Sequence, residues 1–367
     1  MGMGNLGRAL GLALACTAMS VSSGAGAAAD PSPASHPRLW LQRFTHPPQG
    51  RYTSGVVEVP SGFSSAVVSW NVTTPNGSWI ETHLRARIGQ RWTAWYDMGH
   101  WSAQLSSDNR RSRTAAPDAD GRVDTDTLFL RAPANAFQVS VESHAGAAAE
   151  VPQLTLLAVT TGSGKNDASA RGGAPSHVAW GHDIAVPERT QHVHDSPDAL
   201  GGGGEAWCSP TSVSMVMAYW SERLHHPQWD TDVATAANGA FDPVYDGCGN
   251  WPFNVAYASE HGLAGWVERL RGLRDIEAYV EAGLPVIASI KVKPGELAGS
   301  PYKKTDGHLL VVRGFDKGGD VIVNDPAGRP GNIRRVYRRR QFEHVWKHGS
   351  GGIVYVIGPP DILKRLR

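Results

Sequence analysis

A cysteine stands at the start of a predicted helix, where it would have the chemistry of a nucleophile. Cys208 opens the stretch Cys-Ser-Pro-Thr-Ser, in which Pro210 suits a first helical turn. Apolar residues then recur at helical spacing from Val213 to Trp220. The unpaired N–H groups and partial positive charge of a helix start favour a thiolate, which is the reactive form of cysteine.

A histidine and an aspartate are predicted to lie together at one end of a sheet. His308 begins a strand-like run, and Asp325 follows the next such run within the sequence Asn-Asp-Pro. Two adjacent antiparallel strands would let Asp325 orient the His308 ring toward Cys208, which is the arrangement of a catalytic triad. Gln191 lies upstream and could donate a hydrogen bond to an oxyanion, together with the Cys208 backbone N–H.

Each of these residues also has a structural interpretation. Histidine at a strand start is commonly a polar terminus, and Asn-Asp-Pro commonly opens a turn. Cys208 and Cys248 would be the two cysteines of an exported chain, and a disulfide between them would silence the nucleophile. A catalytic triad assisted by an oxyanion donor is the interpretation that gives each of these residues a role: Cys208, His308, Asp325 and Gln191.

The motifs around these residues resemble a known family. Cys-x-Pro-Thr-Ser, Gly-His-Leu-x-Val-Val-x-Gly-Phe and Val-Asn-Asp-Pro-Ala are similar to secreted bacterial members of the bacteriocin-leader-peptidase-like cysteine peptidases (peptidase family C39). The resemblance covers residues 177–359 and implies a papain-like fold. It also implies a triad of Cys208, His308 and Asp325, with Gln191 in the oxyanion position. The founding members cut leader peptides within exporters, but this chain has no exporter segments, and Ser209 stands where many relatives have glycine.

The second half of the chain has an α+β pattern that would position these residues. Besides the helix after Cys208, residues 275–282 form a helix candidate that Gly283 would end. Strand-like runs occupy residues 284–290, 308–312, 321–323 and 353–357. One helix carrying a cysteine on an antiparallel sheet carrying a histidine predicts an α+β papain-like domain over residues 177–367.

The first half shows strand patterns and no helical period. Strand-like runs occupy residues 66–72, 79–88, 127–131, 137–143 and 154–159. In the run 79–88, even-numbered residues such as Ile80 and Leu84 are predicted to face one side of the strand, and Glu81, His83 and Arg85 the other side. Short strands separated by turns predict an all-β sandwich at residues 36–160. Residues 161–176 are rich in glycine, serine and alanine and are predicted to be a linker.

The N-terminus has the pattern of a signal peptide at residues 1–29. Arg8 precedes a short apolar run, and small residues suitable for cleavage follow it. No apolar stretch is long enough to span a bilayer, and the net charge of +1 gives no overall attraction for nucleic acid. We therefore expect a secreted or cell-envelope protein with no nucleic-acid partner and no stable membrane insertion.

Other groups of residues offer ligand-binding alternatives. The aromatic group at 92, 95, 96 and 101 is either sandwich packing or a platform for polysaccharide. Four aspartates, at 118, 120, 124 and 126, are either a solvated loop or a calcium site. The histidine pairs 192/194 and 225/226 lack convincing partners for a metal, and we predict no cofactor. The arginines between 334 and 340 suggest a charged edge strand.

The sequence thus predicts a secreted thiol hydrolase that cleaves peptide or isopeptide bonds through a thioester on Cys208. One alternative is a cell-wall peptidoglycan amidase or endopeptidase that uses the same triad. The other is a non-catalytic carbohydrate-binding protein in which Cys208 is bridged to Cys248.

Overall fold

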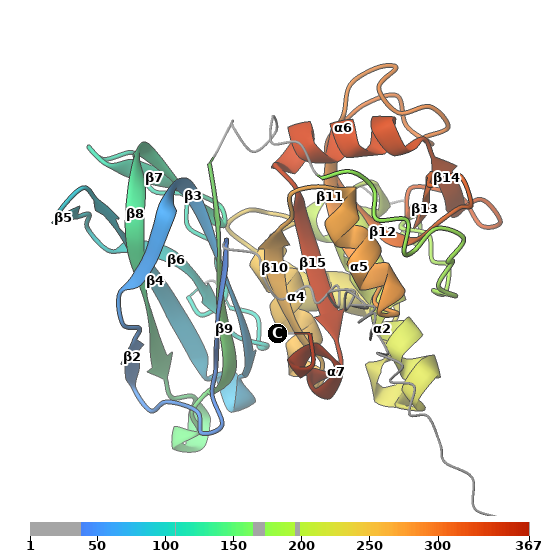
Figure 1. Ribbon diagram of the computed structural model, residues 1–367. Helices are drawn as coiled ribbons and strands as arrows, with labels where there is room; N and C mark the ends of the chain where they lie inside the picture. Colours follow the sequence, from blue (N-terminus) through green and yellow to red (C-terminus); the bar gives the residue numbers. More distant parts are fainter. Residues whose placement is uncertain (1–37, 107, 164–172, 195–198, 367) are drawn as a thin grey trace, which may run out of the picture. The chain divides into compact units, whose positions relative to one another are not determined.

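A computed structural model describes residues 38–106, 108–163, 173–194 and 199–366. The predicted signal peptide at 1–29 and most of the predicted linker lie outside the described residues. Figure 1 shows that strands coloured blue to green make up the N-terminal region, whereas the α-helices belong to the C-terminal region.

The N-terminal region is antiparallel and strand-rich, as predicted. Within the described residues its strands are β1 (Leu39–Arg43), β2 (Arg51–Thr53), β3 (Val57–Thr73), β4 (Trp79–Ile88), β5 (Arg91–Trp92), β6 (Tyr96–Trp101), β7 (Gly121–Asp124), β8 (Thr127–His144) and β9 (Gln153–Gly162). Hydrogen bonds join them into one sheet of order β1-β9-β3-β8-β4-β5, in which β2 and β7 also pair with β8, and β6 with β4. The sandwich itself stays a prediction, and β9 continues two residues past the predicted end at 160.

Strand β4 has the predicted bounds and the predicted alternation. Its even-numbered residues from Ile80 to Ala86 are buried, and its odd-numbered residues are partly exposed. The prediction of two separate runs at 127–131 and 137–143 is wrong, because both belong to the single long strand β8. Pro133 lies within β8, where the register with β3 is irregular.

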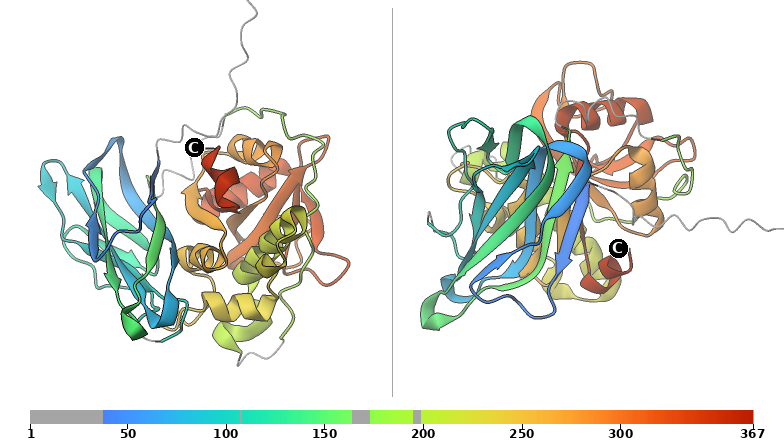
Figure 2. Two further views of the ribbon diagram at one scale, coloured as in Figure 1. Left: turned by 90° about the horizontal axis from the view of Figure 1, so that it is seen from below. Right: turned by 60° about the vertical axis from the view of Figure 1, so that its left-hand side comes forward.

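The C-terminal region contains a second antiparallel sheet. In the described residues its strands are β10 (Ala264–Arg269), β11 (Val286–Val292), β12 (Thr305–Phe315), β13 (Val321–Asn324), β14 (Arg334–Tyr337) and β15 (Ile353–Gly358), in the order β10-β15-β11-β12-β13-β14. The helices are α2 (Cys208–Leu224), α3 (Val233–Ala240), α4 (Trp251–Glu260), α5 (Leu273–Glu281), α6 (Arg339–Ser350) and α7 (Pro360–Lys364). In both views of Figure 2 these helices accompany the yellow-to-red strands, which confirms the α+β pattern.

The arginine-rich segment differs from its prediction. Arg334 and Arg335 lie in β14, which is the edge strand of the described sheet, so this part of the prediction holds. Arg339 and Arg340 instead begin helix α6. The buried side chains Phe342, Val345 and Trp346 explain the change, because they repeat with the spacing of a helical face.

Helix α2 begins at Cys208 as predicted, but residues 208–221 are all buried, so this part of the helix has no exposed face. The hydroxyl residues in its first two turns form hydrogen bonds inside the protein. Ser212 Oγ donates to the carbonyl of Leu309 on β12 at 3.1 Å, and Ser209 Oγ lies 3.0 Å from the Tyr355 hydroxyl on β15. These bonds fix the start of α2 against the sheet that carries His308.

Candidate active site

Cys208 occupies the first position of α2, at the edge of a cleft of about 1780 Å³. Its residue exposure is 9%, and its thiol is free. Trp207 precedes the helix, and its carbonyl accepts hydrogen bonds from both the backbone N–H and the hydroxyl of Thr211. The sulfur therefore lies beside the unpaired N–H groups of a helix start, as the sequence predicts.

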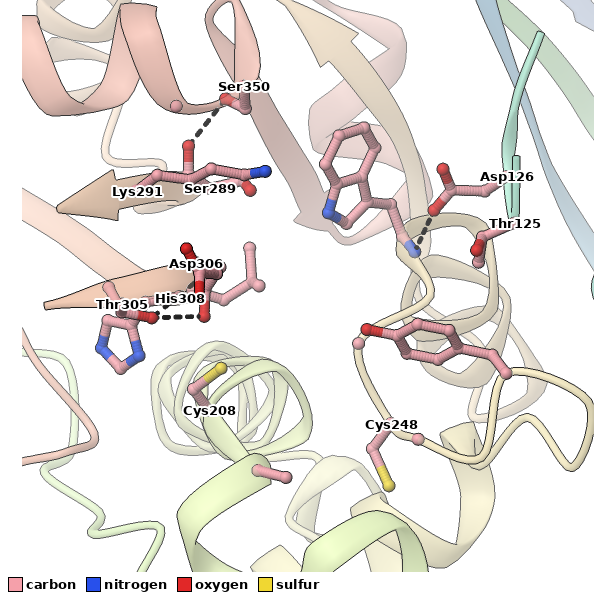
Figure 3. A pocket seen from close by; sticks show the side chains of 18 of the residues that line it. Thr125, Asp126, Cys208, Cys248, Ser289, Lys291, Thr305, Asp306, His308 and Ser350 are labelled. Carbon is pink, nitrogen blue, oxygen red and sulfur yellow. Dashed lines mark hydrogen bonds between the residues drawn. The ribbon is translucent and has the colours of Figure 1, made fainter. Parts of the chain in front are cut away.

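His308 and Asp325 come together as predicted from the strand pattern. The register pairs Val311 of β12 with Asn324 of β13, which puts Asp325 on the same face as His308 and diagonal to it. His308 Nε2 lies 2.8 Å from Asp325 Oδ1, and both side chains are buried. In Figure 3 the His308 ring and Cys208 lie on the same side of the cleft.

Two tyrosines that the sequence did not single out hold the Asp325 carboxylate. The hydroxyls of Tyr302 and Tyr337 donate to Asp325 Oδ2 at 3.0 and 2.7 Å. The backbone N–H of Ala327 donates to Oδ1 at 3.1 Å. Together with His308, these donors satisfy a carboxylate that is fully buried, so its orientation is fixed.

The charges of these groups favour an ion pair. Burial opposes the protonated ring of His308, but the charge of Asp325 and the hydrogen bonds to Asp325 and Cys208 outweigh it and raise its pKa to about 10. Burial also opposes ionisation of Asp325, yet His308, Tyr337 and the Ala327 N–H bring the pKa of that carboxyl below its usual range. The site thus favours an imidazolium beside a carboxylate.

The two cysteines have opposite environments. Burial opposes ionisation of Cys208, but its hydrogen bond with His308, the charge of His308 and the Leu309 N–H lower the pKa of the thiol. Burial raises the pKa of Cys248 to about 12, and its Sγ donates to the Ala237 carbonyl at 3.4 Å. Figure 3 shows the Cys248 sulfur turned away from Cys208. Both thiols are free, so the disulfide alternative is not realised.

Gln191 lines the same cleft as Cys208 and His308. Its side chain is buried, and Nε2 donates to the Glu205 carbonyl at 3.1 Å. Its backbone N–H donates to the carbonyl of Pro326, next to Asp325. Because one of the two Nε2 hydrogens is used for Glu205, the other stays available for a substrate oxygen.

The predicted metal alternatives do not form sites among the described residues. Asp120 pairs with Arg91, and Asp118 accepts a hydrogen bond from the Tyr96 hydroxyl. Two carboxylates of the calcium-site alternative therefore already have partners within the protein. In the described chain, the carboxylates and imidazoles that converge are Glu81, Asp97 and His100, which the sequence did not single out. The aromatic group is divided, because Trp101 is fully buried whereas Trp95 is exposed.

Comparison with known proteins gives two family matches and distant structural ones. A protein described as a C39-like peptidase from Bacillus anthracis is 18% identical, with 48% of this chain and 97% of that chain covered and a TM-score of 0.30. Xylellain, a cysteine protease from Xylella fastidiosa, is 10% identical, with 52% and 92% covered and a TM-score of 0.30. No curated protein sequence matches the chain. Among the described helices, none has the length and hydropathy needed to cross a membrane.

The family matches divide the chain as the fold does. Residues 10–162 match the model of the Peptidase C39 N-terminal domain, and residues 183–353 match that of the Peptidase C39 like family. Both parts of the chain thus match family models of C39 peptidases, and the family resemblance predicted from the sequence is confirmed.

Proposed function

We propose that the chain is a thiol peptidase in which Cys208 is the nucleophile, His308 the acid and base, Asp325 the orienting group and Gln191 an oxyanion donor. The observation that carries the proposal is the hydrogen bond from His308 Nε2 to Asp325 at 2.8 Å. Since Nε2 is bound there, Nδ1 is the nitrogen left for the hydrogen bond with Cys208. This is the arrangement that activates a thiol nucleophile.

The proposed reaction has two steps. The Cys208 thiolate attacks the peptide carbonyl and forms a C–S bond, while Gln191 Nε2 and the Cys208 N–H stabilise the oxyanion. The His308 imidazolium gives its proton to the departing amine, and the C–N bond breaks to leave a thioester. Neutral His308 then takes a proton from water, which attacks the thioester. The C–S bond breaks, the acid product leaves and the thiolate–imidazolium pair is restored.

The fold, location and substrate belong to the same proposal. A helix that carries the nucleophile against an antiparallel sheet that carries His308 and Asp325 supports a papain-like domain. The signal-peptide pattern at residues 1–29 supports export to the cell envelope or the medium. Peptide or isopeptide bonds, including those of cell-wall peptides, are the proposed substrates. The exposed ring of Trp95 supports contact of the N-terminal region with polysaccharide.

The test compares cleavage by wild type, Cys208→Ala and the matched control Cys248→Ala. Casein and peptidoglycan fragments are incubated with each protein, and new amino termini are quantified. We expect cleavage by wild type and the control and loss of cleavage by Cys208→Ala. Release from wall fragments but not from casein would assign the activity to cell-wall peptides. Equal cleavage by Cys208→Ala and wild type would overturn the proposal.

A further inference from the structure

A cluster of acidic and imidazole side chains lies on the sheet face of the N-terminal region that points away from its core. Trp79, Glu81 and His83 alternate with buried residues along β4 and therefore share one face. The register pairs Trp79 with His144 of β8 and Glu81 with His100 of β6. Directly paired residues point to the same side of a sheet, so these imidazoles join Glu81.

A β-bulge brings Asp97 into the same cluster. Residues three apart on a regular strand point to opposite faces, which would separate Asp97 from His100. The register instead shifts between Thr82 and His83, because Gly99 pairs with Thr82 whereas Asp97 pairs with His83. Gly99 has a φ of +117°, a conformation that L side chains rarely adopt. The extra residue turns Asp97 and His100 to the same side.

His100 directs an unpartnered nitrogen into this cluster. The residue is 8% exposed, and its Nδ1 lies 3.2 Å from the Asp108 carbonyl, which can only accept a hydrogen bond. Neutral His100 must therefore carry its proton on Nδ1 and present a lone pair at Nε2. That Nε2 is buried without a well-formed hydrogen bond, 3.3 Å from Asp97 Oδ2 and 3.5 Å from Glu81 Oε1. A metal cation between the lone pair and the two carboxylates would satisfy all three groups.

His144 borders this cluster. Its Nε2 is also buried without a hydrogen-bond partner and lies 3.5 Å from Glu81 Oε2. The ring stacks on Trp79 with a centroid distance of 3.7 Å and an interplanar angle of 8°, which fixes its orientation. Ligands about 2.0–2.2 Å from a tetrahedral ion are separated by about 3.3–3.6 Å. The distances from His100 Nε2 to Glu81 Oε1 and to Asp97 Oδ2 fall in this range.

We propose that Glu81, Asp97 and His100 form a binding site for a zinc ion that ties β4 to β6. One imidazole and two carboxylates are a ligand set that zinc accepts. Hydrogen bonds orient two of the ligand side chains, as is usual in metal sites. His100 Nδ1 lies 3.2 Å from the Asp108 carbonyl, and the Gly99 N–H donates to Asp97 at 2.9 Å. Three protein ligands leave the fourth position of a tetrahedral ion for a water molecule.

The competing arrangement is a metal-free ion pair in which His100 is an imidazolium. Burial disfavours that form, but the contacts with Asp97, Asp108 and Glu81 raise the pKa of His100. Arg113 Nε also lies 2.7 Å from Asp97 Oδ2 and would repel a metal ion. The remaining nearby carboxylate, Glu142, is paired with Arg51, and His83 Nε2 lies 3.1 Å from Glu81 Oε1. Metal binding distinguishes the two arrangements.

The experiment titrates zinc chloride into chelator-treated full-length protein by calorimetry. Cys208→Ala serves as the background, because a reactive thiol beside an imidazole could itself bind zinc. Glu81→Gln and His100→Ala are compared with the matched controls Glu58→Gln and His46→Ala, which change exposed residues outside the cluster. We expect one equivalent of zinc per chain, with affinity at least about tenfold weaker in both cluster variants and unchanged in both controls.

A spectroscopic measurement on the unmutated cluster keeps the proposal testable if a cluster variant does not fold. Cobalt(II) replaces zinc in the same Cys208→Ala protein, and a tetrahedral site gives an intense visible absorption that a six-coordinate site lacks. A tetrahedral spectrum that saturates at one equivalent supports the proposal. Absence of zinc binding, binding that survives both cluster variants unchanged, or a six-coordinate spectrum would overturn it. None of these results depends on peptidase activity.

Discussion

The substitution Asp325→Asn tests the charge balance of the active site. Asparagine keeps the shape of the side chain and an oxygen that can accept from His308, but it removes the negative charge. In the structure that charge lies in a buried contact of 2.8 Å with His308 Nε2. A hydrogen bond between charged groups contributes about 1.5–3 kcal/mol. About 1.4 kcal/mol corresponds to one pKa unit, so the His308 pKa should fall by about 1–2 units.

The direction of the effect on activity follows from the role of His308. The protonated ring supplies the proton to the leaving amine, so activity falls as pH rises through its folded-state pKa. That pKa is about 10 in the wild type. We therefore expect the alkaline limb of kcat/KM to begin about 1–2 pH units lower in Asp325→Asn, in line with the lost charge interaction.

The assay is the pH dependence of kcat/KM for a fluorogenic peptide derived from a cleaved substrate. Wild type, Asp325→Asn and the control Asp361→Asn are measured in parallel, and the control changes an aspartate that is 86% exposed on α7. Circular dichroism at each pH shows whether the proteins stay folded. An alkaline limb in Asp325→Asn that coincides with that of the wild type would refute the proposed ion pair.

Two further substitutions test the neighbours of the triad. Gln191→Ala should lower kcat by about 10²–10³-fold with little change in KM, because an oxyanion donor acts in the transition state; an unchanged kcat under steady-state conditions would remove Gln191 from the mechanism. Tyr337→Phe removes a buried donor to the Asp325 carboxylate and should lower the free energy of unfolding by about 1.5–3 kcal/mol in urea titration. A loss no larger than that of Tyr245→Phe, which changes a half-exposed tyrosine, would show that the hydroxyl contributes nothing.

The core of the candidate site could be predicted because its signals are local. A proline two residues after Cys208 and apolar residues at helical spacing identify the helix start. Two neighbouring strand patterns joined by a short turn bring His308 and Asp325 together without knowledge of the rest of the fold. The family resemblance by itself predicted that Gln191 lies beside Cys208, without knowledge of contacts between distant segments.

The features that escaped prediction depend on contacts between distant segments. Tyr302 lies in a loop and Tyr337 on an edge strand, and neither position indicates that both hydroxyls reach one carboxylate. The acidic and imidazole cluster escaped for a different reason. The bulge in β6 breaks the two-residue period, so alternation alone would assign Asp97 and His100 to opposite faces. The burial of the start of α2 also depends on distant segments, because Ser209 and Ser212 contact Tyr355 on β15 and Leu309 on β12.

The most direct measurement of the central claim is the reactivity of the two thiols. Unreduced protein is treated briefly with iodoacetamide at pH 7, and the modified cysteine is identified by peptide mapping with mass spectrometry. Cys248, with a pKa of about 12, should have roughly one thiolate in 10⁵ molecules at this pH. Cys208 should react first and leave Cys248 unmodified. A Cys208 that is bridged, or that reacts no faster than Cys248, would contradict the assignment of Cys208 as the nucleophile.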